Sequence, residues 1–177
     1  TNQRTDRYGG AIENRARFLF DTLDAVVAVW GAGRVALRLS PSGTYGTMSD
    51  SNPHATFGHV ARHLNDYALA YLHVIEPRIR GIVERATQEG EVTSKDIRRT
   101  YRGTVIAAGG FTGESAEQII ADGHADMVAF GRMFISNPDL PHRLRNGSPL
   151  TPYDRSTFYG GDARGYTDYA SGSATAA

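Results

Sequence analysis

Two glycine-containing turns follow two short apolar stretches in the second half of the chain. Val105 to Ala108 runs into Gly109-Gly110, and Met127 to Phe130 runs into Gly131-Arg132. Glycine lets the backbone approach a ligand closely, and unpaired N–H groups at the start of a helix attract anions. Arg132 adds a planar, permanently charged guanidinium that suits a phosphate. These residues therefore predict a phosphate site made by two strand-to-helix turns.

Each of the two turns has a plainer interpretation when it is taken alone. Gly109-Gly110 and Gly131 could form ordinary turns, and Arg132 could be a surface arginine. The occurrence of both pairs after consecutive strands favours the phosphate site, because the last two strand-to-helix loops of a (β/α)8 barrel often form one. The family of phosphate-binding aldolases or isomerases is a weaker option, since it requires a catalytic Lys or paired carboxylates at strand ends. Here the strands offer Glu76 followed by Pro77, and Lys95 falls in a predicted helix.

Arg38 is a charged residue inside the apolar stretch VALRL. It could simply reach solvent or pair with an acid. Active sites of parallel barrels lie at the carboxyl ends of the strands. A position near such an end therefore favours a ligand role for Arg38, in which it neutralises developing anionic charge.

Other kinds of chemistry receive little support. The chain has no cysteine and no net charge, with 19 basic and 19 acidic residues, which argues against thiolate chemistry, nucleic-acid binding and anionic membranes. His54, His59 and His63 do not predict a metal site, because no carboxylate motif joins them and Arg62 marks a solvated face. No nucleophile elbow, P-loop or HExxH motif is present. With no apolar run of transmembrane length and no visible signal peptide, we expect a cytoplasmic protein.

The elements that position these residues alternate between helix and strand. Alternation of this kind predicts an α/β fold with a parallel sheet, and four strand–helix units are about half of a (β/α)8 barrel of roughly 250 residues. An open sheet of four strands would leave two unpaired edges, which calls for a partner. The expected helices are 12–30, 55–70, 94–101, 114–121 and 133–145, the expected strands are 35–39, 71–76, 105–108 and 127–130, and residues 78–93 are expected to form a mobile loop.

Five motifs resemble the C-terminal half of the old yellow enzyme family of FMN-dependent ene-reductases. In chain order they are NQRTDRYGGAIENRARF, RLSPSGTYG, AAGGFT, FGRMFISNPDL and FYGGDARGYTDY. The resemblance implies one half-barrel over residues 1–177, made of strands five to eight of a (β/α)8 TIM barrel. The small residues of the C-terminal end predict a disordered tail over 170–177. The resemblance also implies that NAD(P)H reduces bound FMN, which passes hydride to the C=C bond of an activated alkene such as an enone or nitroalkene.

The resemblance assigns roles to the residues that match these motifs. Arg38 would face the pyrimidine edge of FMN. Gly109, Gly110, Gly131 and Arg132 would hold the FMN phosphate. Tyr159 would border the substrate pocket, with Tyr45 more loosely beside it.

The same resemblance places the family's proton-donating Tyr and its substrate-holding His/Asn pair just before NQRTDRYGG, so no catalytic residue of that set is expected within this chain. The chain is therefore expected to be poorly active alone and to need an N-terminal half-barrel or a second chain. The alternative is a non-catalytic half-barrel that binds FMN or another phosphorylated ligand and needs a partner to close its sheet.

Overall fold

The computed structural model describes residues 1–80 and 83–172. Within these ranges every helix is too short or too polar to cross a membrane. The chain forms two compact units, Thr1–Ala129 and Phe130–Ala177. Residues 173–177, most of the tail expected to be disordered, lie outside the described residues.

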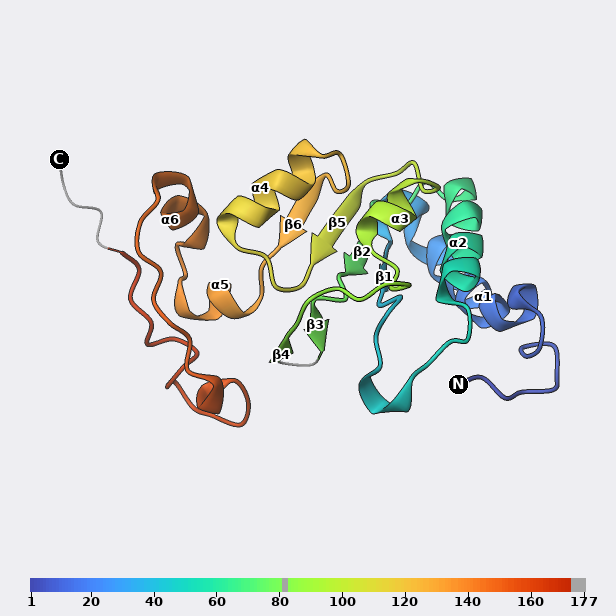
Figure 1. Cartoon of the computed structure of the whole chain (residues 1–177), viewed down its shortest axis with the longest axis horizontal. Coiled ribbons are helices and arrows are strands. Elements are labelled where there is room, and N and C mark those ends of the chain that lie inside the picture. The colour runs from blue at the N-terminus through green and yellow to red at the C-terminus, as the bar shows by residue number, and fades with distance from the viewer. Residues whose placement is uncertain (81–82, 173–177) are drawn as a thin grey trace. The chain divides into compact units, whose positions relative to one another are not determined.

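The first unit is built on a four-stranded parallel sheet (Figure 1). Its strands lie side by side in chain order, and pairing brings Arg38, His73, Ile106 and Met127 into one row across the sheet. Parallel neighbours in chain order require a crossover helix between them, as the alternating pattern predicted. The strands are β1 (Ala36–Leu39), β2 (Tyr71–Ile75), β5 (Val105–Ala108) and β6 (Met127–Ala129).

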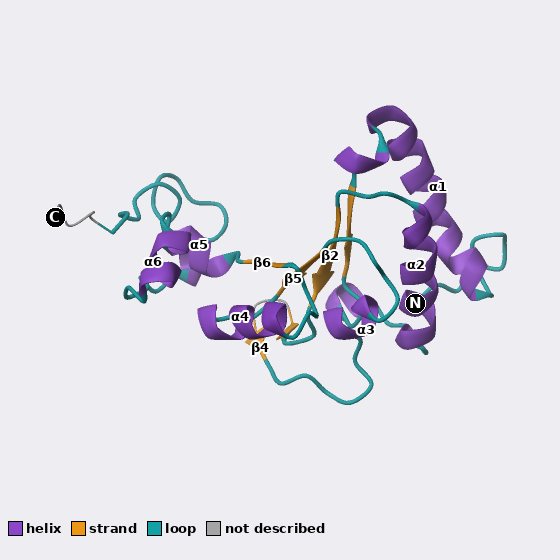
Figure 2. Cartoon of the chain, turned by 90° about the horizontal axis from the view of Figure 1, so that it is seen from above, coloured by secondary structure: helices purple, strands orange, loops and turns teal. Residues whose placement is uncertain are grey.

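Four α-helices accompany this sheet in the part of the first unit that the structure describes. Gly31, with a positive φ of 76°, ends α1, while Asn52 and Thr112 cap the first turns of α2 and α4 with their side-chain oxygens. Helices α1, α2 and α3 lie together along one side of the strands (Figure 2). Their bounds are α1 Ile12–Trp30, α2 Pro53–His63, α3 Ser94–Arg98 and α4 Gly113–Ala121. Helix α2 is shorter than expected, because residues 64–66 tighten into a 3₁₀ turn, Leu64–Asp66.

The two faces of the sheet differ in burial. Alternate residues that point toward the helices form the core of this unit. They include Leu39, Leu72, Val74, Val105 and Ala107, all of them buried. The residues between them are more open, since Arg38 and Met127 are exposed and His73, Ile75 and Ile106 are only partly buried. We call this second side the open face.

The loop after β2 contains more structure than expected. Strands β3 (Ile79–Arg80) and β4 (Val83–Glu84) pair antiparallel, and residues 81 and 82 between them are outside the described part. Farther on, Arg85 forms an ion pair with Glu91, which also accepts the backbone N–H of Gln88 at 2.6 Å. The segment expected to be a mobile loop thus contains an antiparallel pair of short strands, followed by a turn closed by an ion pair.

The single helix expected over 133–145 is wrong, because the second unit is interrupted there. It contains two helices, α5 (Arg132–Ser136) and α6 (Leu140–Asn146). The break falls at Asn137, because a residue before proline avoids the helical conformation, and Asn137 has φ −134° and ψ 83°. Its buried amide bonds instead to the backbone of Met133 and Thr151. In the described parts of the chain, further 3₁₀ turns occur at Ala32–Arg34, Tyr45–Thr47 and Arg155–Thr157.

Candidate functional site

The carboxyl ends of the four parallel strands meet at one edge of the first unit's sheet. The turn after β5 begins with Gly109 and Gly110, whose φ values are +114° and +63°. A side chain is strained at such angles. A Cβ on Gly109 would also lie 3.3 Å from the carbonyl oxygen of Glu76, and one on Gly110 would lie 3.4 Å from Ile79. Both positions therefore need glycine, which leaves backbone rather than side chain at the surface of the turn.

Arg78 adds a cation to this turn that sequence reasoning did not single out. Its Nη2 lies 3.5 Å from the carbonyl oxygen of Gly109, and its guanidinium carbon lies 4.2 Å from the centre of the Phe111 ring. The sequence feature that could have identified Arg78 is its position two residues after Glu76, the charged residue that follows β2. The polar composition of the loop that follows hid that signal.

Two hydrogen-bonded braces join the loops at this edge. The Ser42 hydroxyl, in the loop after β1, donates to the carbonyl of Val92 at 3.1 Å and accepts its N–H at 2.8 Å. The buried carboxylate of Glu76 accepts the N–H of Ser94 at 2.8 Å, where α3 begins. Glu76 therefore has a structural role: its carboxylate ties the end of β2 to the start of α3.

Arg38 lies on the open face, level with His73 on the neighbouring strand. The guanidinium is exposed, whereas the Nε2 atom of His73 is buried and has no hydrogen-bond partner within the described residues. Burial lowers the pKa of His73 below its usual value, and the nearby charge of Arg38 lowers it further. His73 is thus held as a neutral ring beside a permanent cation.

The other predicted residues lie elsewhere in the chain. Gly131 and Arg132 belong to the second unit, where Gly131 precedes the first turn of α5. The Nη1 of Arg132 donates to the hydroxyl of Tyr153 at 3.2 Å, and its guanidinium faces the Tyr153 ring. Tyr159 of that unit is 87% exposed, and Tyr45 of the first unit is 79% exposed. Whether the Gly131 turn meets the Gly109 turn stays a prediction.

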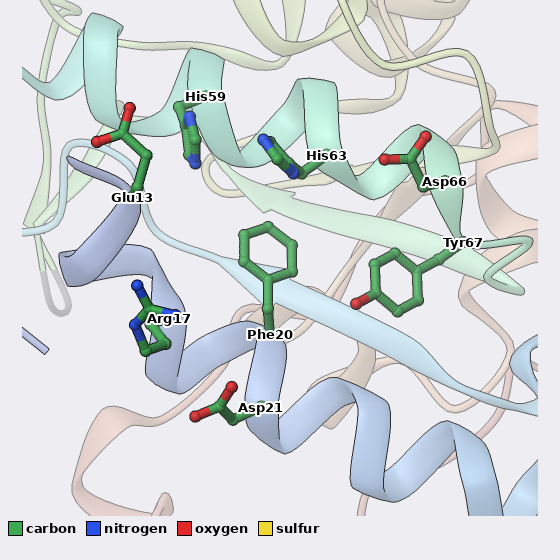
Figure 3. Close-up of a pocket in the computed structure, with 8 residues that line it drawn as sticks. All are labelled: Glu13, Arg17, Phe20, Asp21, His59, His63, Asp66 and Tyr67. Carbon is green, nitrogen blue, oxygen red and sulfur yellow. The ribbon is translucent and has the colours of Figure 1, made fainter. Parts of the chain in front are cut away.

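A cavity of about 350 Å³ lies between α1 and α2 of the first unit, and none of the predicted site residues lines it (Figure 3). The Phe20 ring stacks on Tyr67 and faces His63, and the rings of His59 and His63 are 4.4 Å apart. Burial lowers the pKa of His59, and the neighbouring His63 lowers it further. No group of three metal-ligating side chains occurs in the described ranges. The cavity is lined by Glu13, Arg17, Phe20, Asp21, His59, His63, Asp66 and Tyr67.

Known proteins resemble this chain in sequence and in fold. Residues 1–151 match the model of the NADH:flavin oxidoreductase / NADH oxidase family. The 12-oxophytodienoate reductase 2 of Arabidopsis thaliana is 44% identical over 176 residues, which are 99% of this chain and 46% of that protein. The chain therefore spans less than half the length of this relative.

Solved structures give the same result. A morphinone reductase in complex with tetrahydroNAD superposes with a TM-score of 0.88 at 43% identity, over 98% of this chain and 46% of that one. The old yellow enzyme homologue from Zymomonas mobilis gives a TM-score of 0.89 at 39% identity, over 96% of this chain and 47% of its own. The four-stranded parallel sheet thus matches a part of these larger folds.

Proposed function

Since this chain belongs to the NADH:flavin oxidoreductase / NADH oxidase family, which includes the old yellow enzymes, we propose that it provides the FMN-phosphate region of an NAD(P)H-dependent reductase of activated alkenes. FMN is the family's cofactor, and it supplies the hydride chemistry when bound. The protein's part is to hold and orient the cofactor and to balance its charge. The substrate class would be enones or nitroalkenes.

The observation that carries this proposal is the glycine turn at the carboxyl end of β5. Gly109 and Gly110 have positive φ, which disfavours any side chain, and a Cβ on Gly109 would be crowded by Glu76, so a phosphate could approach the main chain directly. Helix α4 begins just beyond, at Gly113, and its N-terminal N–H groups favour an anion. The guanidinium of Arg78 adds positive charge on the same turn. The residues present therefore fit the phosphate group of FMN.

Arg38 and Arg132 extend the proposal in two directions. Arg38 stands exposed on the open face near the end of β1, where its charge would lie at the edge of the flavin ring. In the family motif, Gly131 and Arg132 follow the next strand, and we propose that they complete the phosphate site. Tyr159 and Tyr45, both highly exposed, would border the substrate.

A partner half-barrel is a further part of the proposal. The sheet ends in β1 on one side and β6 on the other, and α1 exposes Phe18, Val29 and Trp30. Apolar side chains gathered on one helix favour burial against another chain segment. We therefore expect the 177-residue chain to bind FMN weakly and to reduce alkenes poorly until the other half of the barrel is added.

Titration of FMN into the purified chain, followed by quenching of flavin fluorescence, tests the cofactor part. Binding should weaken in a Gly110→Ala variant and persist in Gly123→Ala, which has a similar φ of +71° but lies outside the turn. Oxidation of NADPH with cyclohexenone, with and without an N-terminal half from a relative, tests the catalytic part. Failure of FMN to bind under either condition would overturn the proposal, and brisk turnover by the chain alone would overturn its division into halves.

A further inference from the structure

His73 stands out on the open face because it is a titratable ring set among apolar residues. Pairing of β1 with β2 places it level with Arg38, and pairing of β2 with β5 places Ile106 on its other side. Residues level with one another on adjacent strands point to the same face of a sheet and interact directly. Arg38 and His73 are therefore lateral neighbours.

No carboxylate shares this face in the part of the chain that the structure describes. Arg38 carries the one permanent charge among the open-face residues of the four strands, and on β2 itself Tyr71 is the other titratable group. Strands β5 and β6 contribute residues that do not titrate. The open-face residues are Ala36 and Arg38 on β1, Tyr71, His73 and Ile75 on β2, Ile106 and Ala108 on β5, and Met127 and Ala129 on β6.

Two consequences follow from this arrangement. The positive charge of Arg38 is not offset, because no carboxylate lies on this face in the described part of the chain. A proton on His73 would place two cations side by side, which is unfavourable. The buried Nε2 of His73, without a hydrogen-bond partner in the described ranges, agrees with a ring that stays neutral while the arginine is uncompensated.

We propose that Arg38 and His73 form one coupled pair, in which His73 is the positioning residue and takes up a proton from solvent when an anion binds to Arg38. The bound anion offsets the charge of Arg38, so a protonated His73 is no longer repelled by an uncompensated guanidinium. Linkage makes the effect reciprocal, since a proton on His73 must then tighten binding of the anion. This inference rests on the proposed function, in which the anion is the reduced flavin ring.

Proton uptake by His73 can be followed in the 177-residue chain by imidazole ¹⁵N NMR during a pH titration. A His73→Gln variant assigns its signals among the six histidines. An Arg38→Met variant should shift the His73 titration to higher pH, whereas Arg38→Lys, which keeps the charge, should leave it near the wild-type position. An Arg62→Met variant is the matched control, because Arg62 lies on α2, outside the row of residues that contains His73, and its removal should leave the His73 titration unchanged. An unmoved His73 titration in Arg38→Met overturns the coupling.

The second measurement repeats the titration with saturating oxidised FMN and with FMN reduced beforehand by dithionite. The reduced ring carries a negative charge near neutral pH, so it should shift the His73 titration to higher pH, while oxidised FMN should change it little. The shift should disappear in Arg38→Met. If reduced FMN binds and His73 does not respond, the proposed linkage is wrong although the proposed function stands. If neither oxidised nor reduced FMN binds, the proposed function fails. The titration of His73 in Arg38→Met then decides alone whether the two residues are coupled.

Discussion

The two faces of the sheet in the first unit differ in what their side chains do. Toward the helices, Leu72, Val74 and Val105 are completely buried and contribute apolar contacts. On the open face, Arg38 and His73 place a charge and a neutral imidazole side by side. Because side chains alternate along each strand, neighbouring residues such as Leu72 and His73 serve these separate purposes. If the proposed ligand role of the open face holds, stability and ligand binding can be changed independently by substitutions one residue apart.

Substitution of the core should have the largest effect. Leu72→Ala removes a fully buried side chain, and we expect it to lower the free energy of unfolding by about 2–5 kcal/mol. Ile75→Ala, on the open face of the same strand, should cost at most about 1.5 kcal/mol, because its side chain is already partly exposed. Urea unfolding followed by circular dichroism measures both values. Equal losses would show that the two faces are packed alike.

The next largest effect is expected from substitution in the Gly109-Gly110 turn. Gly109→Ala combines a φ of +114° with contact to Glu76, so we expect a loss of about 1–3 kcal/mol in stability and weaker FMN binding. Gly123→Ala is the control, since it has positive φ but nothing within 4 Å of its Cβ, and should cost about 1 kcal/mol. Unfolding curves and FMN titrations distinguish strain from crowding. Identical behaviour of the two variants would remove the special role of the Gly109 turn.

Arg38 should affect binding without affecting folding. Arg38→Met removes an exposed charge, and we expect FMN affinity to fall about tenfold, as for one charged contact of about 1.4 kcal/mol. The melting temperature should stay unchanged. Arg34→Met, an exposed arginine just before β1, should change neither quantity. Loss of stability in Arg38→Met, with unaltered FMN affinity, would assign Arg38 to the structural side of the comparison.

The smallest effect is expected at alkaline pH, on the helical side. Burial and then the hydrogen bond to Asp24 raise the pKa of Tyr67 from 10.0 to about 12. The folded state therefore holds this proton more tightly than the unfolded chain. The resulting stabilisation is complete below pH 10.0 and is lost as pH rises toward about 12. The difference in unfolding free energy between wild type and Tyr67→Phe should shrink over this range, and a constant difference would contradict the shift.

Much of the fold was predictable because the local signals agree with the tertiary structure. The helix expected over 12–30 is observed as α1 at the same bounds, and the runs VALRL, YLHVIE and VIAA predicted three of the parallel strands within one residue. The resemblance to old yellow enzymes and the barrel fold class are confirmed by the family match and the structural neighbours. Assignment of individual residues to FMN stays a prediction.

The misses have physical causes. The apolar periodicity of residues 133–145 passes through Asn137-Pro138, and a buried hydrogen-bonding amide followed by proline overrides that periodicity. Glu76 could not be recognised as a brace, because its partner Ser94 lies 18 residues away. His73 could not be singled out from the sequence, since its position beside Arg38 depends on which residues of the other strands stand level with it.

The bond between Glu76 and Ser94 has a consequence for how this protein can change. It closes the base of the segment between them, and the second brace, from Ser42 to Val92, fixes the same base from the neighbouring loop. We expect the stretch between β4 and Val92 to tolerate changes of length while its ends stay in place, because each doubling of a flexible loop adds only about 0.6 kcal/mol of closure entropy, whereas Arg78 and Ile79 must keep their contacts with the Gly109-Gly110 turn. The part of the segment beyond β4 is therefore where a new recognition element could be inserted without moving the ends of the strands or the Arg78 side chain.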